Sequence, residues 1–146
     1  MESAIAELKA QELTGGNAFA TFNHLELEHV EEDYAVFRLA IQPESRNPFG
    51  FVHGGMLAGM ADNAAGYAAH TDGRTYVTQA SHLNYIHNQA GGVIRAEGRV
   101  INRGRKICLV RVNILGEDGR LLATGELVYY CVDPDELERQ AALGKS

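Results

Sequence analysis

Asp62 is the residue whose type and surroundings most clearly suggest chemistry. The segment from Gly54 to about Thr71 is expected to form a helix that is apolar nearly all round, with Asp62 as its only formal charge. A helix of that pattern is a buried helix. Burying a lone ionised carboxylate is costly, so a chain keeps one only with partners or for a purpose. Two ordinary interpretations stay open: Asp62 is exposed at a helix edge, or a neighbour such as Asn63 satisfies it.

The expected start of this helix, His53-Gly54-Gly55, is the second candidate group. The first N–H groups of a helix lack internal partners and carry the positive end of the helix dipole. Glycine lets a ligand approach that backbone without meeting a Cβ. A carbonyl oxygen that becomes negative during a reaction would therefore find donors here. The alternative is a simple turn, for which paired glycines are also typical.

The spacing of the two groups predicts how they would have to meet. Gly54 and Asp62 are 62 − 54 = 8 residues apart, which is about 12 Å of helical rise. A carboxylate that attacks a carbonyl carbon must lie within about 3.5 Å of it. One protomer can hardly supply both groups, whereas two antiparallel copies of the helix about a two-fold axis could. The spacing therefore predicts a homodimer with two shared sites.

The rest of the chain supplies elements that could position this helix. We expect a short helix over about 3–13, a hairpin with strands through Leu25–Leu27 and Ala35–Ile41, and a short helix over about 135–143. Four strands should follow the buried helix as an antiparallel meander, at roughly Thr75–His87, Val93–Asn102, Lys106–Leu115 and Leu121–Val132, because Gly-containing turns separate them. The prediction is one α+β domain over 1–146, with a core of about 24–132 in which a curled antiparallel sheet wraps around one helix.

Composition excludes several classes of function. A net charge of −6 argues against nucleic-acid binding and means that an anionic ligand needs a local cationic patch. No apolar run has the length of a membrane span, and no signal peptide is expected, so we predict a cytoplasmic protein. Cys108, Cys131 and the histidines show no metal-ligand spacing, so no metal is expected.

The combined pattern Asn47-x-x-Gly50-x-x-His53-Gly54-Gly55, followed after six residues by Asp62, resembles the signature of hotdog-fold thioesterases. The resemblance is to the phenylacetic-acid-degradation (PaaI-like) branch. It implies a hotdog fold, and a dimer that pairs into a tetramer. It also implies that Asp62 is the nucleophile or the general base of acyl-CoA hydrolysis and that the Gly54 N–H is the oxyanion donor.

The resemblance assigns further roles. Asn47 would orient the thioester or the attacking water, His53 would shape the helix start, and Thr78 would supply a hydroxyl that assists the water. Coenzyme A, which is part of the substrate and product and not a separate cofactor, would lie along the following residues: Gly55, Tyr85, His87, Asn88, Asn102, Arg103, Gly104, Arg105 and Lys106. The three cations in that last hairpin suit phosphates, although a solvated basic turn has the same composition.

Two other functions stay open. A hotdog dehydratase or hydratase acts on acyl-CoA or acyl-carrier protein, but no His-Phe-Pro-Gly-type loop is present. A non-catalytic acyl-CoA-binding protein is the other alternative, and the retained Asp62 weighs against it. The acyl group is undetermined: Phe49, Phe51, Tyr67 and Tyr85 could line an apolar pocket, but aromatic residues of this kind are more often core.

Overall fold

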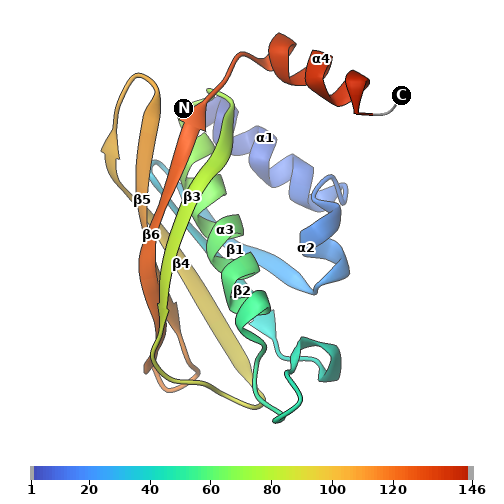
Figure 1. The fold of residues 1–146 in the computed structure, drawn as a ribbon, viewed down its shortest axis with the longest axis vertical. Coiled ribbons are helices and arrows are strands. Elements are labelled where there is room, and N and C mark those ends of the chain that lie inside the picture. Colours follow the sequence, from blue (N-terminus) through green and yellow to red (C-terminus); the bar gives the residue numbers. More distant parts are fainter. Residues whose placement is uncertain (1, 145–146) are drawn as a thin grey trace.

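The computed structural model describes residues 2–144, which form four α-helices and six strands. The helices are α1 (Glu2–Leu13), α2 (Ala18–Phe22), α3 (Gly54–His70) and α4 (Pro134–Leu143), with a 3₁₀ turn at Pro43–Ser45. The strands are β1 (Leu25–Glu31), β2 (Tyr34–Ala40), β3 (Tyr76–Tyr85), β4 (Val93–Arg103), β5 (Ile107–Leu115) and β6 (Leu121–Cys131). The α+β hotdog arrangement is confirmed: α3 packs against one face of an antiparallel sheet, and α1 and α2 lie on the other side of α3 (Figure 1).

The close packing of α3 on the sheet follows from small residues on both elements. Buried positions of the helix include Leu57, Met60 and a run of alanines. On the sheet, a Cβ added at Gly98 of β4 would lie 2.7 Å from the carbonyl oxygen of Ala64. Gly98 thus allows the helix backbone to rest directly on the strand, and the predicted buried helix is confirmed.

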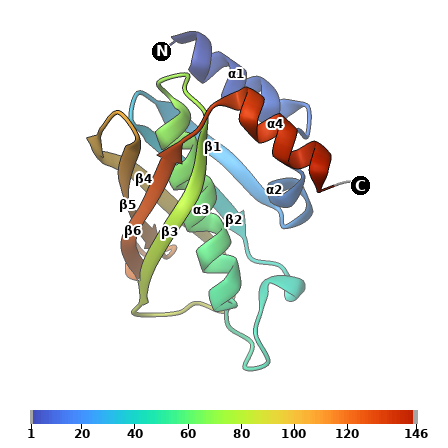
Figure 2. The same cartoon turned by 45° about the horizontal axis from the view of Figure 1, so that its top comes forward.

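The predicted four-strand meander is confirmed for β4, β5 and β6, which pair in chain order, but it is wrong for β3. The sheet order is β1-β2-β4-β5-β6-β3, so β3 pairs with β6 at one edge and β4 pairs with β2 and β5. The connection between β3 and β4 is not a hairpin but crosses below the start of α3 (Figures 1 and 2). Backbone hydrogen bonds to three separate segments hold this connection in place. The donors and acceptors are the Ile86 N–H and Leu122 carbonyl, the Val52 N–H and Gln89 carbonyl, and the Ile41 N–H and Gly92 carbonyl. Its glycines signal a turn but do not specify which strand lies beside β3.

The bounds of the other helices and strands agree closely with those predicted from the sequence, and the structure adds one helix. The short helix α2 was not predicted, because its five residues are too few for a periodic pattern. The Asn17 side chain caps it by accepting a hydrogen bond from the Ala20 N–H. Among residues 2–144, no helix has both the length and the apolar character needed to cross a membrane.

Arg103, at the end of β4, fixes the C-terminal end of α3. Its guanidinium lies 2.7 Å from Oδ2 of Asp72 and 2.8 Å from Oδ1 of Asp33. It also donates to the carbonyl oxygens of Ala69 and Ala68, at 2.9 and 3.3 Å. A cation at this end of a helix complements the dipole and supplies donors to the carbonyl groups of the last turn. The basic hairpin therefore begins with a side chain that is used inside the protein.

Asp72 depends on this arrangement for its ionised form. Burial by itself raises the pKa of Asp72, but hydrogen bonds from Tyr76 and Arg74 and the charge of Arg103 outweigh burial and lower it. A carboxyl group with a lowered pKa stabilises the fold at neutral pH, and this contribution is lost as the pH falls through the lowered value.

Replacing Arg103 by Met should therefore lower the free energy of unfolding by about 3 kcal/mol at pH 7, because Asp72 loses its more buried cation and keeps only Arg74. The control is Arg111→Met, which removes an exposed ion pair with Glu126 and should cost less than about 1 kcal/mol. Urea denaturation measures both. The effect of Arg103→Met should shrink at acid pH, as the pH falls through the lowered pKa of Asp72 and the carboxylate becomes protonated. Equal effects of the two substitutions at pH 7 would contradict this role for Arg103.

Candidate active site

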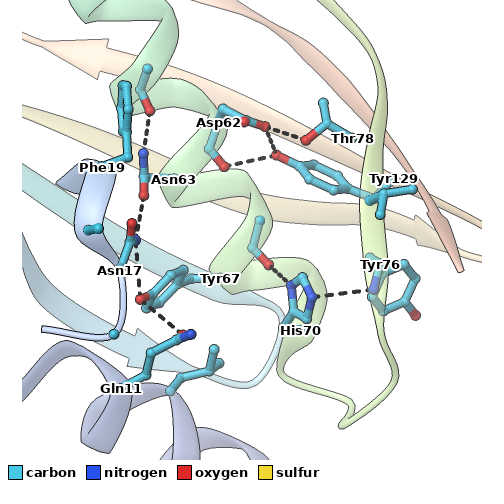
Figure 3. A pocket seen from close by; sticks show the side chains of 16 residues that line it. Gln11, Asn17, Phe19, Asp62, Asn63, Tyr67, His70, Tyr76, Thr78 and Tyr129 are labelled. Carbon is cyan, nitrogen blue, oxygen red and sulfur yellow. Dashed lines mark hydrogen bonds between the residues drawn. The ribbon is translucent and has the colours of Figure 1, made fainter. Parts of the chain in front are cut away.

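A cavity of about 630 Å³ lies beside the middle of α3 (Figure 3). One wall comes from α1 and α2, and the opposite wall comes from β3 and β6. The labelled side chains around it are Gln11, Asn17, Phe19, Asp62, Asn63, Tyr67, His70, Tyr76, Thr78 and Tyr129. Asp62 therefore faces a space that could hold part of a ligand.

The Asp62 carboxylate is held by two hydroxyl groups. Thr78 on β3 donates to Oδ1 at 2.8 Å, and Tyr129 on β6 donates to the same oxygen at 2.6 Å (Figure 3). Asn63 is not its partner, since the Asn63 amide donates to the carbonyl oxygen of Gly59. Asp62 is thus half-buried and partnered, and the Thr78 hydroxyl predicted near the reacting water contacts the carboxylate itself.

The start of α3 leaves one backbone donor free. His53 is the N-cap, and its Nδ1 accepts a hydrogen bond of 2.8 Å from the Gly55 N–H. The Gly54 N–H has no acceptor within residues 2–144. A Cβ added at Gly54 would meet nothing within 4 Å, so the approach to this N–H is open. Of the two glycines, Gly54 is the one available to an oxyanion.

Asn47 shapes the loop before the helix. Its Oδ1 accepts hydrogen bonds from the N–H groups of Phe49 and Phe51, at 2.9 and 3.1 Å. The carbonyl end of this side chain is therefore occupied by the loop, and the amide end is the part that could reach a ligand. The Phe49 side chain, 85% exposed, points away from the core, and Phe51 and Tyr85 are exposed as well. Of the four aromatic candidates for the pocket, only Tyr67 lines this cavity.

The residues proposed to bind coenzyme A fall into two groups at opposite ends of α3. Asn88 donates to the carbonyl oxygen of Val52, which places the segment Tyr85–Asn88 beside the helix start, near Gly54 and Gly55. The hairpin Asn102–Lys106 lies at the other end, where Arg103 contacts Ala68 and Ala69. The helix between them has 17 residues, or about 25 Å. Arg105 and Lys106 are exposed, whereas Arg103 is engaged inside the chain.

Sequence reasoning missed the residue that contacts Asp62 at the shortest distance, Tyr129. It lies in an alternating strand, where a buried aromatic side chain is expected as core. It also missed the polar wall opposite Asp62, in which the Asn17 amide donates to Asn63 at 2.8 Å and contacts the Tyr67 hydroxyl at 3.4 Å. These contacts join segments about fifty residues apart, and no local pattern signals them.

His70 also lines the cavity, but both of its ring nitrogens are used. Nδ1 lies 2.6 Å from the Gly66 carbonyl oxygen, to which it must donate, and Nε2 accepts from the Tyr76 N–H at 3.3 Å (Figure 3). This pattern fits the neutral ring and a structural role. Within residues 2–144, no three His, Cys, Asp or Glu side chains are grouped so that they could hold a metal ion.

The chain is similar in sequence and in fold to known thioester hydrolases. The 1,4-dihydroxy-2-naphthoyl-CoA hydrolase of Escherichia coli is 24% identical over 123 residues, covering 82% of this chain and 90% of that protein. The acyl-coenzyme A thioesterase PaaI of Escherichia coli is 23% identical, with 68% of this chain and 71% of that protein covered. In fold, the solved structure of the Escherichia coli PaaI protein matches with a TM-score of 0.82 at 20% identity, covering 88% of this chain and 94% of that chain.

The family itself is shown by a family model. The model of the thioesterase superfamily matches residues 49–123, just over half of the chain, and this segment includes Gly54, Asp62 and Thr78. The predicted PaaI-like resemblance and the prediction of a thioester hydrolase are confirmed at this level. The chain belongs to the thioesterase superfamily.

Proposed function

We propose that this protein hydrolyses an acyl- or aryl-acyl-CoA thioester to the free acid and coenzyme A, without a metal or separate cofactor. The observation that carries the proposal is the Asp62 carboxylate, which is fixed by the Thr78 and Tyr129 hydroxyls at the edge of a cavity large enough for an acyl group. A protein that only binds acyl-CoA has no use for a partly desolvated carboxylate. The relatives named as CoA thioester hydrolases support the substrate class.

In the proposed reaction, Asp62 either attacks the thioester carbonyl carbon or removes a proton from a water that attacks it. The carbonyl oxygen becomes negative and accepts a hydrogen bond from the Gly54 N–H. The C–S bond then breaks, and coenzyme A leaves as the thiol with a proton that comes from water. If Asp62 attacked the carbon, a water then hydrolyses the acyl–Asp62 anhydride and restores the carboxylate, so both routes consume one water. Both roles of Asp62 need its ionised form.

We propose that the site is completed by a second copy of the chain. The Asp62 and Gly54 groups are 8 residues apart on one helix, so a single chain holds them about 12 Å apart. The edge strand β3 favours such pairing, since it is ten residues long and mostly exposed, and its outer edge has no partner strand among the described residues. An unpaired edge of this length is a template for another strand. Pairing β3 with its copy about a two-fold axis would set the two α3 helices antiparallel.

The same two-fold arrangement would bring together the two groups of coenzyme A residues. In an antiparallel pair, the C-terminal end of one α3 lies near the N-terminal end of the other. The hairpin with Arg105 and Lys106 of one protomer would then lie toward the partner's helix start. The exposed Arg105 and Lys106 are the cations that we propose for the phosphates. A pairing of such dimers into tetramers and a cytoplasmic location remain predictions.

The direct test is hydrolysis of a panel of acyl- and aryl-acyl-CoA substrates, with the released thiol as the readout. Asp62→Asn should lower kcat by about 10²-fold or more, because the reacting carboxylate is lost. KM should change little, because Asp62 lies far from the nucleotide. The control Glu126→Gln makes the same charge change on β6 and should keep wild-type rates. If a folded Asp62→Asn protein keeps more than about a tenth of wild-type kcat, the proposed role is wrong.

The phosphate anchor has a separate test. Replacing Arg105 and Lys106 together by Ala should raise KM severalfold at low ionic strength and leave kcat nearly unchanged, because only ground-state binding is lost. The control Lys9→Ala with Arg139→Ala removes the same charge from α1 and α4. If both double variants raise KM equally, the effect belongs to net charge and the hairpin is not part of the site.

A further inference from the structure

The two oxygens of the Asp62 carboxylate have different surroundings. Oδ1 accepts both hydrogen bonds, from Thr78 at 2.8 Å and from Tyr129 at 2.6 Å. Oδ2 accepts no hydrogen bond from any of residues 2–144. A carboxylate oxygen with two strong donors has less electron density to offer than its free neighbour. The carboxylate is therefore held by one oxygen and open at the other.

Tyr129 is placed to control the direction of that open oxygen. The residue is 2% exposed, and its ring lies against Gly66, one helical turn after Asp62. Its hydroxyl lies 2.6 Å from Oδ1 and 2.9 Å from the main-chain carbonyl oxygen of Asp62 (Figure 3). One buried hydroxyl thus contacts both the side chain and the backbone of the same residue, which restricts rotation of the Asp62 side chain.

Tyr129 can act as a donor throughout the neutral range. Burial, followed by the charge of Asp62, raises the pKa of Tyr129 well above its ordinary value. The hydroxyl therefore stays protonated and donates to the carboxylate. By contrast, Thr78 lies in the exposed part of β3, where water competes for its hydrogen bond.

We propose that Tyr129 is a positioning residue that ties down Oδ1 of Asp62, so that Oδ2 is the oxygen that attacks the carbonyl or accepts the proton from water. The proposal rests on the proposed function and goes beyond it, because it assigns the reacting atom. Tyr129 lies outside residues 49–123, the part of the chain that the superfamily model matches. A small misplacement of a reacting group can lower the rate by a large factor. The Tyr129 hydroxyl can therefore affect the rate although it contacts Oδ1 and not the reacting Oδ2.

The test is Tyr129→Phe, which keeps the ring against Gly66 and removes only the hydroxyl. The expected result is a fall in kcat by a factor of about 10–100 with KM within about twofold, since the loss affects the reacting group and not the bound nucleotide. The matched control is Tyr130→Phe, the next residue of β6, which is 37% exposed and should leave kcat unchanged. Urea denaturation should show that both variants are fully folded under assay conditions.

The pH profile of kcat separates positioning from a purely structural role. Removing a donor from a carboxylate disfavours its ionised form, so the acid limb of the profile should move to higher pH in Tyr129→Phe. The other titratable side chains that line the cavity are His70, Tyr67 and Tyr76, and Glu12 contacts the Tyr67 hydroxyl. All of them are unchanged in the variant, so the displacement of the limb reports on Asp62.

Three outcomes overturn the proposal while leaving the proposed function intact, provided that Asp62→Asn is inactive. The first is a folded Tyr129→Phe protein with kcat within about twofold of wild type. The second is a fall in kcat accompanied by an equal rise in KM. The third is a fall in kcat with no movement of the acid limb. If Asp62→Asn is itself fully active, Asp62 has no catalytic role. The proposed function is then contradicted, and the role proposed for Tyr129 is contradicted with it.

Discussion

The site depends on one carboxylate, that of Asp62, which lies in the middle of a helix, α3, whose other side chains are mostly apolar and packed in the core. Moving an ionised carboxylate out of water is costly unless donors replace the water. Two hydroxyls do so for Asp62, and they come from β3 and β6, which pair at the sheet edge. Close contact of α3 with the sheet, permitted by Gly98 on β4, places the helix within reach of both. The site therefore exists only when β3 lies beside β6, and the strand order of the sheet is part of its chemistry.

This dependence explains how much could be predicted from the sequence. Helix periodicity and a lone Asp locate α3 and its functional residue, and the Gly pair locates the helix start, because all of these are local patterns. The pairing of β3 with β6 was missed because the connection after β3 carries the same glycines as a tight turn. The strand order is set by burial of the helix across the whole sheet, and it cannot be predicted from any short segment of the sequence.

The same reasoning explains why Tyr129 and the polar wall of the cavity escaped notice. A tyrosine in an alternating strand reads as core, and its hydroxyl gains a function only through contact with a residue 67 positions earlier. Asn17 and Asn63 are 46 positions apart in the sequence, and they meet only because α2 lies across α3. Arg103 shows the opposite error: a basic hairpin suggests phosphate binding, yet one of its cations stabilises the end of α3 through Asp72 and Asp33.

The central claim is that Asp62 of one chain works with Gly54 of another, and mixed dimers test it most directly. One inactive variant is Asp62→Asn. The other is Gly54→Pro, which removes the free N–H at a position where proline suits a helix start; His53 before it already has the extended backbone, φ −66° and ψ 137°, that precedes proline. Gly54→Ala, which keeps the N–H but adds a Cβ, separates the loss of the donor from the added bulk. Co-refolding the two inactive variants should restore up to roughly a quarter of wild-type activity, given random pairing and one intact site in each mixed dimer. No recovered activity, in a preparation shown to contain mixed dimers, would contradict the shared site.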